Sequence, residues 1–168
     1  MKLPILAVAL AFALTLPAAA QERVTPAETP EALFTSPDPK LHANKQVVYR
    51  IIHELLEAGH WDRADELLSG EYLQHNPNAA SGRAAVVDFF TKVLKVQPKP
   101  IPERISIKVV SVVAEGDLVV VSFVRTEPDP RKKGQTYTTT WFDMWRIRDG
   151  KAVEHWDPAL VGESPNLD

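Results

Sequence analysis

The chain has 168 residues, of which 19 are basic, 22 are acidic and none is cysteine. Because no thiol is present, disulfide bonds and thiolate chemistry are excluded, and stability must come from a hydrophobic core. A net charge of −3 gives no electrostatic attraction to nucleic acid or anionic lipid, so neither is expected as a partner.

The first residues have the pattern of a secretory signal peptide. Lys2 is followed by an apolar run over residues 3–16 and then by Pro17-Ala18-Ala19-Ala20, with Gln21 next. A basic start, a short apolar stretch and an Ala-x-Ala site are typical of cleaved signals, and the run is shorter than the about 20 residues of a membrane span. We expect cleavage after Ala20, a periplasmic or secreted protein, and no membrane attachment afterwards.

The exported part is expected to form one domain. Residues 21–40 contain four prolines and no sustained apolar period, which predicts a mobile lead-in. The domain itself is expected over residues 41–160, with residues 161–168 as a C-terminal tail. Its length is sufficient to bury a core.

Three helices are predicted in the first half of the domain, over residues 43–58, 61–68 and 82–96. In the first, apolar residues recur at helical spacing, and Gly59 ends it. A polar and aromatic segment, residues 71–78, separates the second helix from the third. Alternating prolines at 98, 100 and 102 predict a stiff, extended linker after the third helix.

The second half reads as strands, over residues 105–114, 118–125, 137–148 and 152–157. Helices followed by an antiparallel sheet of hairpins indicate an α+β fold. We expect the sheet to curl around the long first helix and to leave a cavity at its open end.

The last hairpin turns at Asp149-Gly150, and its register decides which side chains share a face. A two-residue turn would pair Arg148 with Lys151 and separate Asp143 from His155. A three-residue turn, with Gly150 at the left-handed bulge position, would place Asp143 opposite His155. Glycine's tolerance of positive φ favours the second register, although both remain open.

In that second register one face carries two carboxylates, an imidazole and two indoles. These are the side chains of Trp141, Asp143, Trp145, His155 and Asp157. A carboxylate walled by tryptophans is partly desolvated, which favours its protonated form and suits acid–base catalysis. The face therefore predicts a pocket in which protons are transferred.

Three segments carry a resemblance to a known family. They are Tyr72-Leu73-Gln74-His75-Asn76-Pro77, Trp141-x-Asp143, and Asp149-Gly150-Lys151-x-x-Glu154-His155-Trp156-Asp157. They closely resemble the SnoaL-like proteins of the nuclear transport factor 2-like superfamily, over about residues 40–158. The resemblance implies a cone-shaped, strongly curved antiparallel sheet wrapped around three N-terminal helices.

The resemblance also implies a chemistry. SnoaL-like polyketide cyclases carry out intramolecular aldol condensation by acid–base catalysis without metal or cofactor. By similarity, Asp157 is the acid–base carboxylate, with His155 and Asp143 beside it. Tyr72, Gln74 and His75 then line the mouth of the pocket, with Trp141 and Trp145 as its aromatic walls. The superfamily also implies a homodimer through the convex face of the sheet.

Other interpretations of these residues remain open. Asp157 could cap the turn at Pro158, and His155 could be a core imidazole bonded to Asp143. His155-x-Asp157 with His75 or Asp143 could also ligate a divalent ion, but no HExxH-type spacing supports a metal site, and none is predicted. The same pocket could bind a small apolar ligand without catalysis, because one fold serves many functions.

Overall fold

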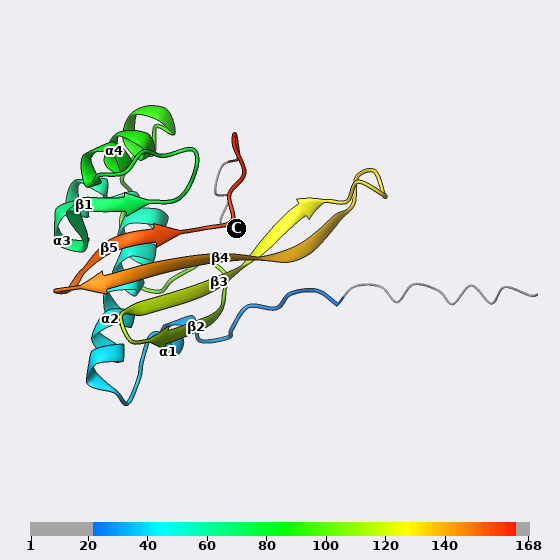
Figure 1. The fold of residues 1–168 in the computed structure, drawn as a ribbon. Helices are drawn as coiled ribbons and strands as arrows, with labels where there is room; N and C mark the ends of the chain where they lie inside the picture. The colour runs from blue at the N-terminus through cyan, green and yellow to red at the C-terminus, as the bar shows by residue number, and fades with distance from the viewer. Residues whose placement is uncertain (1–21, 164–168) are drawn as a thin grey trace, which may run out of the picture.

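The computed structural model describes residues 22–163, so the predicted signal peptide and the end of the tail lie outside the described part of the chain. Within residues 22–163 no helix combines the length and the apolar character needed to cross a membrane. Helices precede the sheet in the chain order, with one strand between them, and the α+β prediction is confirmed (Figure 1).

The long first helix is α2, Pro39–Arg50, which continues as the π-helical η1, Ile51–Glu57. It begins four residues before the predicted start because Asp38 caps it, accepting from the backbone N–H groups of Lys40 at 2.8 Å and Leu41 at 3.0 Å. Proline at the first helical position suits this start, since its missing N–H has no partner there anyway.

Gly59 ends this helix for two reasons. Its φ is +75°, which favours glycine, and an added Cβ would lie 2.8 Å from the carbonyl oxygen of Gln97. The chain then forms the short helices η2, Trp61–Arg63, and α3, Ala64–Leu67, where a helix was predicted. The tight approach at Gly59 holds the proline linker against the end of η1.

Strand β1, Leu68–Gln74, was not predicted. It pairs in parallel with the last strand, at the edge of an otherwise antiparallel sheet. The predicted third helix is present as α4, Arg83–Asp88, followed by the π-helical η3, Phe89–Val93. The predicted polar segment thus supplies a sheet strand and the loop that leads into this helix.

The remaining strands follow the prediction, although the first begins at residue 109 instead of 105. They are β2, Val109–Glu115; β3, Leu118–Pro128; β4, Thr136–Arg148; and β5, Lys151–Trp156. The five strands lie in the order β1-β5-β4-β3-β2, and the sheet does not close on itself. In Figure 1 α2 passes behind the sheet, while the β3–β4 hairpin extends beyond the body as an arm.

The expected mobile lead-in is instead packed on the domain from Val24 onward. Val24 N–H donates to Thr138 Oγ1 at 2.8 Å, and Ala27 N–H donates to the carbonyl of Val109 at 2.8 Å. The short helix α1, Pro30–Leu33, then directs Phe34 into the core, where it is 0% exposed. A single aromatic residue without an apolar period gives no local signal for this packing.

The final hairpin uses neither predicted register along its whole length. Asp149 and Gly150 have φ of 49° and 73°, which forms a two-residue turn that pairs Arg148 with Lys151. The favoured three-residue turn was therefore wrong. A bulge at Val153 then shifts the pairing by one residue, so that His155 lies opposite Trp145.

The bulge nevertheless produces the predicted shared face. Beyond Val153, alternate residues of β4 and β5 point to the side of the helices again. Asp143, Trp145 and His155 are accordingly buried on that side, at 5%, 2% and 7% exposure. The site therefore depends on one extra residue in β5.

Replacing Phe34 by alanine tests whether the lead-in belongs to the core. We expect the variant to lower the free energy of unfolding by about 3–5 kcal/mol, because it removes a fully buried ring. Chemical denaturation measures this change, with Leu73→Ala as a control because Leu73 is 50% exposed. Equal losses in the two variants would show that Phe34 contributes nothing beyond a surface residue.

Candidate active site

A cavity lies between the inner face of the sheet and the helices, with about 570 Å³ of atom-free space that includes some open solvent. Its sheet side is polar, lined by Tyr72, Gln74, Asn76, Asp143, His155 and Asp157. Its other wall is apolar and aromatic, with Trp61, Phe89 and Phe90 among its members. A pocket with a mainly apolar lining and polar groups on one side suits a small, mainly apolar molecule.

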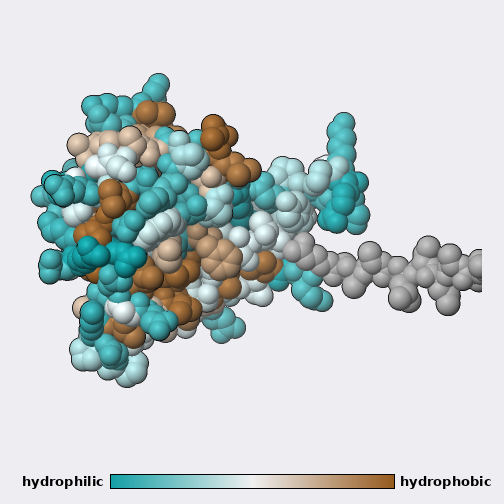
Figure 2. All heavy atoms as spheres, in the orientation of Figure 1, coloured by the Kyte–Doolittle hydropathy of each residue, from teal (hydrophilic) through white to brown (hydrophobic). Residues whose placement is uncertain are grey.

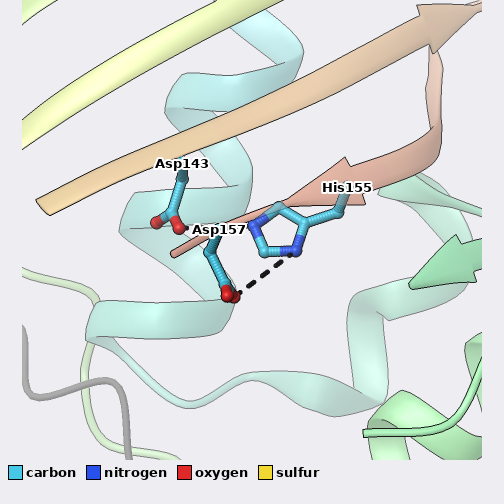
Figure 3. A group of neighbouring side chains, drawn as sticks. All are labelled: Asp143, His155 and Asp157. Carbon is cyan, nitrogen blue, oxygen red and sulfur yellow. Dashed lines mark hydrogen bonds and ion pairs between the residues drawn. The ribbon is translucent and has the colours of Figure 1, made fainter. Parts of the chain in front are cut away.

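The ring of His155 has a carboxylate near each of its two nitrogens, and the three side chains form a triangle (Figure 3). Its Nε2 is 3.3 Å from Asp143 Oδ1, and its Nδ1 is 3.9 Å from Asp157 Oδ2. Nδ1 is also 2.8 Å from Gln74 Oε1, the shorter contact. The trio predicted from the hairpin is thus brought together in one buried cluster.

Asp143 is held from behind by an indole. Trp141 Nε1 donates to Asp143 Oδ1 at 2.9 Å, so this oxygen faces both the indole and His155. Trp141 is buried but does not line the cavity, which differs from its predicted role as a wall. Trp141 instead orients the carboxylate of Asp143, which does line the cavity.

Asp157 both caps a turn and faces the cavity, so the two interpretations of this residue are compatible. Its Oδ1 accepts from the backbone N–H of Ala159 at 2.9 Å, and its Oδ2 accepts from Asn76 Nδ2 at 2.7 Å. Each carboxylate oxygen of Asp157 thus accepts one hydrogen bond and keeps a further lone pair. The geometry therefore suits a carboxylate that accepts a proton from a bound molecule.

Tyr72 supplies a phenol that stays protonated. Burial raises its pKa well above the ordinary value of 10.0, and the negative charges of Asp143 and Asp157 add to this effect. The hydrogen bond with Trp145 opposes it without cancelling it. A neutral phenol beside the carboxylates is a hydrogen-bond donor for a substrate oxygen.

The match to a family agrees with this arrangement. The model of the SnoaL-like domain matches residues 48–155, which is more than half of the chain. The chain belongs to the SnoaL-like family. This places it in the nuclear transport factor 2-like superfamily, as its motifs predicted, while no curated protein matches it.

Solved structures agree at the level of the fold. A candidate polyketide cyclase from Acidithiobacillus ferrooxidans is 16% identical, with a TM-score of 0.50 over 73% of this chain and 89% of that one. A candidate SnoaL-like polyketide cyclase from Jannaschia sp. CCS1 is 23% identical, with a TM-score of 0.50 over 74% of this chain and 90% of that one. At these identities the likeness concerns the SnoaL-like fold alone.

His75, predicted at the mouth of the pocket, is not among the residues that line it. Its ring stacks on Trp156 at 5.0 Å between centroids, and its Nε2 lies 2.9 Å from Glu154 Oε1. Because alternate residues of a strand point to opposite faces, Gln74 reaches the cavity while His75 points to the other side of the sheet. In this SnoaL-like protein, Gln74 and His75 therefore lie on opposite faces of the sheet.

The aromatic wall formed by Trp61 and Phe90 was not predicted from the sequence. Trp61 and Phe90 stack at 3.9 Å between centroids and face the polar side of the cavity. Trp61 Nε1 is the one buried side-chain nitrogen or oxygen within residues 22–163 that has no hydrogen-bond partner. Trp61 and Phe90 lie on different helices, so no local sequence signal pairs them.

The cluster has both the composition and the spacing of a metal site. One ligand atom each from Asp143, His155 and Asp157 lie within 4.8 Å of one another. The two carboxylates, however, lie next to different nitrogens of the His155 ring, and a single ion reaches only one of those nitrogens. Hydrogen bonds from Trp141 and Asn76 orient the two carboxylates, an arrangement that also suits proton transfer.

The outer face of β5 allows a test by pH. The hydrogen bond from His75 lowers the pKa of Glu154 below its ordinary 4.5; burial opposes this effect and Arg146 adds to it. A lowered folded-state pKa stabilises the protein above the unfolded-state pKa, and this stability is lost as pH falls through the folded-state value. We therefore expect Glu154→Gln to lower the melting temperature near neutral pH.

This difference should shrink as the pH falls from about 4.5 toward the lowered value, because protonated glutamic acid and glutamine then carry the same charge. Melting curves of both proteins over a series of pH values measure it. Asp62→Asn is the control, since Asp62 has a 72% exposed side chain. A difference that stays constant into acid would contradict the assignment of this stability to ionised Glu154.

Proposed function

We propose that this protein catalyses a cofactor-free acid–base reaction of the aldol or isomerase type on a small apolar carbonyl compound. The observation that carries the proposal is the buried imidazole between two carboxylates, set opposite an aromatic wall. Such a site combines a proton acceptor with donors for a carbonyl oxygen in a partly water-excluded pocket. A polyketide cyclase-like fold is consistent with this class of reaction.

In the proposed reaction Asp157 removes a proton from the carbon next to the carbonyl. The electron pair of the broken C–H bond moves onto the carbonyl oxygen, which becomes an enolate. The neutral phenol of Tyr72 and the amide nitrogen of Gln74 donate hydrogen bonds to this oxygen. In an isomerisation protonated Asp157 then returns the proton to a carbon of the product. In an aldol condensation the enolate carbon first attacks a second carbonyl carbon of the substrate and forms the C–C bond. The π electron pair of that carbonyl moves onto its oxygen, and protonated Asp157 gives its proton to the resulting alkoxide.

The location of the reaction is part of the proposal. The basic start, apolar run and Ala-x-Ala site of residues 1–20 support export to the periplasm, and these residues lie outside the described part of the chain. The substrate would then be a compound present outside the cytoplasm. Fractionation of a producing bacterium, with mass determination of the mature N-terminus, tests this location.

Asp157→Asn tests the catalytic proposal. The amide keeps the shape of the side chain and removes the base, so we expect turnover to fall by on the order of 10²–10⁴ fold. The melting temperature should change by only a few degrees. The measurement is hydrogen–deuterium exchange at the α-carbon of a panel of small aromatic and aliphatic ketones, followed by NMR. Wild-type turnover retained in the variant would contradict the proposal.

The aromatic wall supports an alternative from another class, a pocket that binds a small apolar ligand without catalysis. Trp61, Phe90 and Trp145 offer stacking and apolar contact and need no proton transfer. In this case the affinity for the same ketones should survive Asp157→Asn and fall sharply in Trp145→Ala. Calorimetric titration of both variants separates this alternative from catalysis.

We further propose a homodimer through the outer face of the sheet. Figure 2 shows apolar side chains gathered over the sheet on the face that is turned away from α2 in Figure 1. Phe142 and Val113 on this face are 52% and 63% exposed. Exposed apolar side chains concentrated on one face are typical of protein interfaces.

Phe142→Glu tests the dimer. A buried, unpaired charge at the centre of an apolar interface is costly, so we expect the variant to be monomeric at concentrations at which the wild type is dimeric. Sedimentation equilibrium measures the mass, with Val161→Glu as control because Val161 is 86% exposed on the C-terminal segment. A wild-type protein that is monomeric at all concentrations would overturn the proposal.

A further inference from the structure

The side-chain amide of Gln74 has a defined orientation. The backbone N–H of Asn76 lies 3.1 Å from Gln74 Oε1. A backbone N–H can only donate, so the atom that faces it must be the carbonyl oxygen of the side chain and not its nitrogen. The backbone N–H of Asn76 therefore fixes the orientation of the Gln74 amide, because this group can only donate.

The same oxygen determines a proton on His155. Gln74 Oε1 lies 2.8 Å from His155 Nδ1, and an amide oxygen can only accept. Nδ1 must therefore carry a hydrogen. The other ring nitrogen, Nε2, faces Asp143 Oδ1 at 3.3 Å. The hydrogen bond at one ring nitrogen decides the role of the other.

A second amide acts on Asp157 in the same way. Asn78 N–H donates to Asn76 Oδ1 at 2.8 Å, which leaves Asn76 Nδ2 as the atom that donates to Asp157 Oδ2. Asp157 Oδ2 is thus an acceptor, and it faces the protonated Nδ1 of His155 at 3.9 Å. The backbone N–H groups of Asn76 and Asn78, just after β1, thus orient the side-chain amides of Gln74 and Asn76.

We propose that Gln74, whose amide nitrogen faces the substrate in the proposed reaction, has a second, positioning role: its amide oxygen keeps the proton on His155 Nδ1, so that only His155 Nε2 exchanges a proton, and does so with Asp143. The role in catalysis rests on the proposed function, whereas the proton arrangement does not. This proton arrangement gives the two carboxylates different roles. Asp157 remains the base, while Asp143 shares a proton with His155.

Few other groups compete for this proton. The titratable groups that face the ring from the sheet are Asp143, Asp157 and the phenol of Tyr72, which stays neutral. The ring of Trp145 lies 5.0 Å from that of His155 between centroids, and the facing helices contribute apolar and aromatic side chains. The Nε2 proton therefore has one acceptor of matching charge, Asp143.

The ¹⁵N NMR spectrum of protein labelled with ¹⁵N-histidine tests this arrangement directly and needs no substrate. We expect His155 Nδ1 to show the chemical shift of a protonated nitrogen in the folded protein. His60 is an internal reference, since its Nε2 lies 2.9 Å from the carbonyl of Lys99 and must donate. His155→Asn assigns the signal.

Two variants of Gln74 complete the test. Gln74→Leu removes the acceptor, so the signal of an exclusively protonated Nδ1 should disappear, and ketone exchange should fall about 10² fold with a changed pH profile. Gln74→Glu keeps an accepting oxygen and should retain the protonated Nδ1. An unprotonated Nδ1 in the wild type, or an unchanged spectrum in Gln74→Leu, would overturn the proposal.

The two proposals fail separately. If no ketone is turned over, the wild-type spectrum still decides the proton position on His155. If the spectrum contradicts the arrangement while Asp157→Asn still abolishes exchange, the base assignment stands and the role of Gln74 is rejected. The wild-type spectrum also keeps the test valid if Gln74→Leu does not fold.

Discussion

The site depends on the parallel pairing of β1 with β5. This pairing sets Gln74 beside His155 in register and is continued by a hydrogen bond from His75 N–H to the carbonyl of His155 at 3.1 Å. Residues that are about 80 positions apart in the chain thereby become neighbours along two strand ends. Without this contact Asp157 and His155 would lose the two amides that orient them.

The polar cluster is compatible with a hydrophobic core because its groups are paired. Asp143, His155 and Asn76 are each less than 10% exposed, and a buried polar group without a partner costs about 1–3 kcal/mol. Here Trp141, Gln74 and the backbone N–H groups of the loop after β1 supply the partners. The low dielectric that makes unpaired groups costly also strengthens these bonds. The geometry of the site and the stability of the core thus use the same hydrogen bonds.

The opposite face of β5 carries a separate network that supports the strand from outside. Arg146 pairs with Glu154 at 3.0 Å and with Asp117 at 2.8 Å, and its guanidinium lies over the ring of Trp156. The ring of His75 also stacks on that of Trp156. Because the strand is supported on both faces, its inner side chains have little freedom to leave the cavity.

The sequence alone determined the three helical segments after residue 38, four of the five strands and the grouping of Asp143, His155 and Asp157, because these depend on local periodicity and on a motif. Only the tertiary structure decided that Phe34 is in the core, that residues 68–74 form a strand and that His75 points outward. Each of these depends on contacts between distant segments, which no local pattern encodes. The hairpin register is the clearest case: the turn follows from Asp149-Gly150, whereas the bulge that reunites Asp143 with His155 is set by pairing along the whole strand.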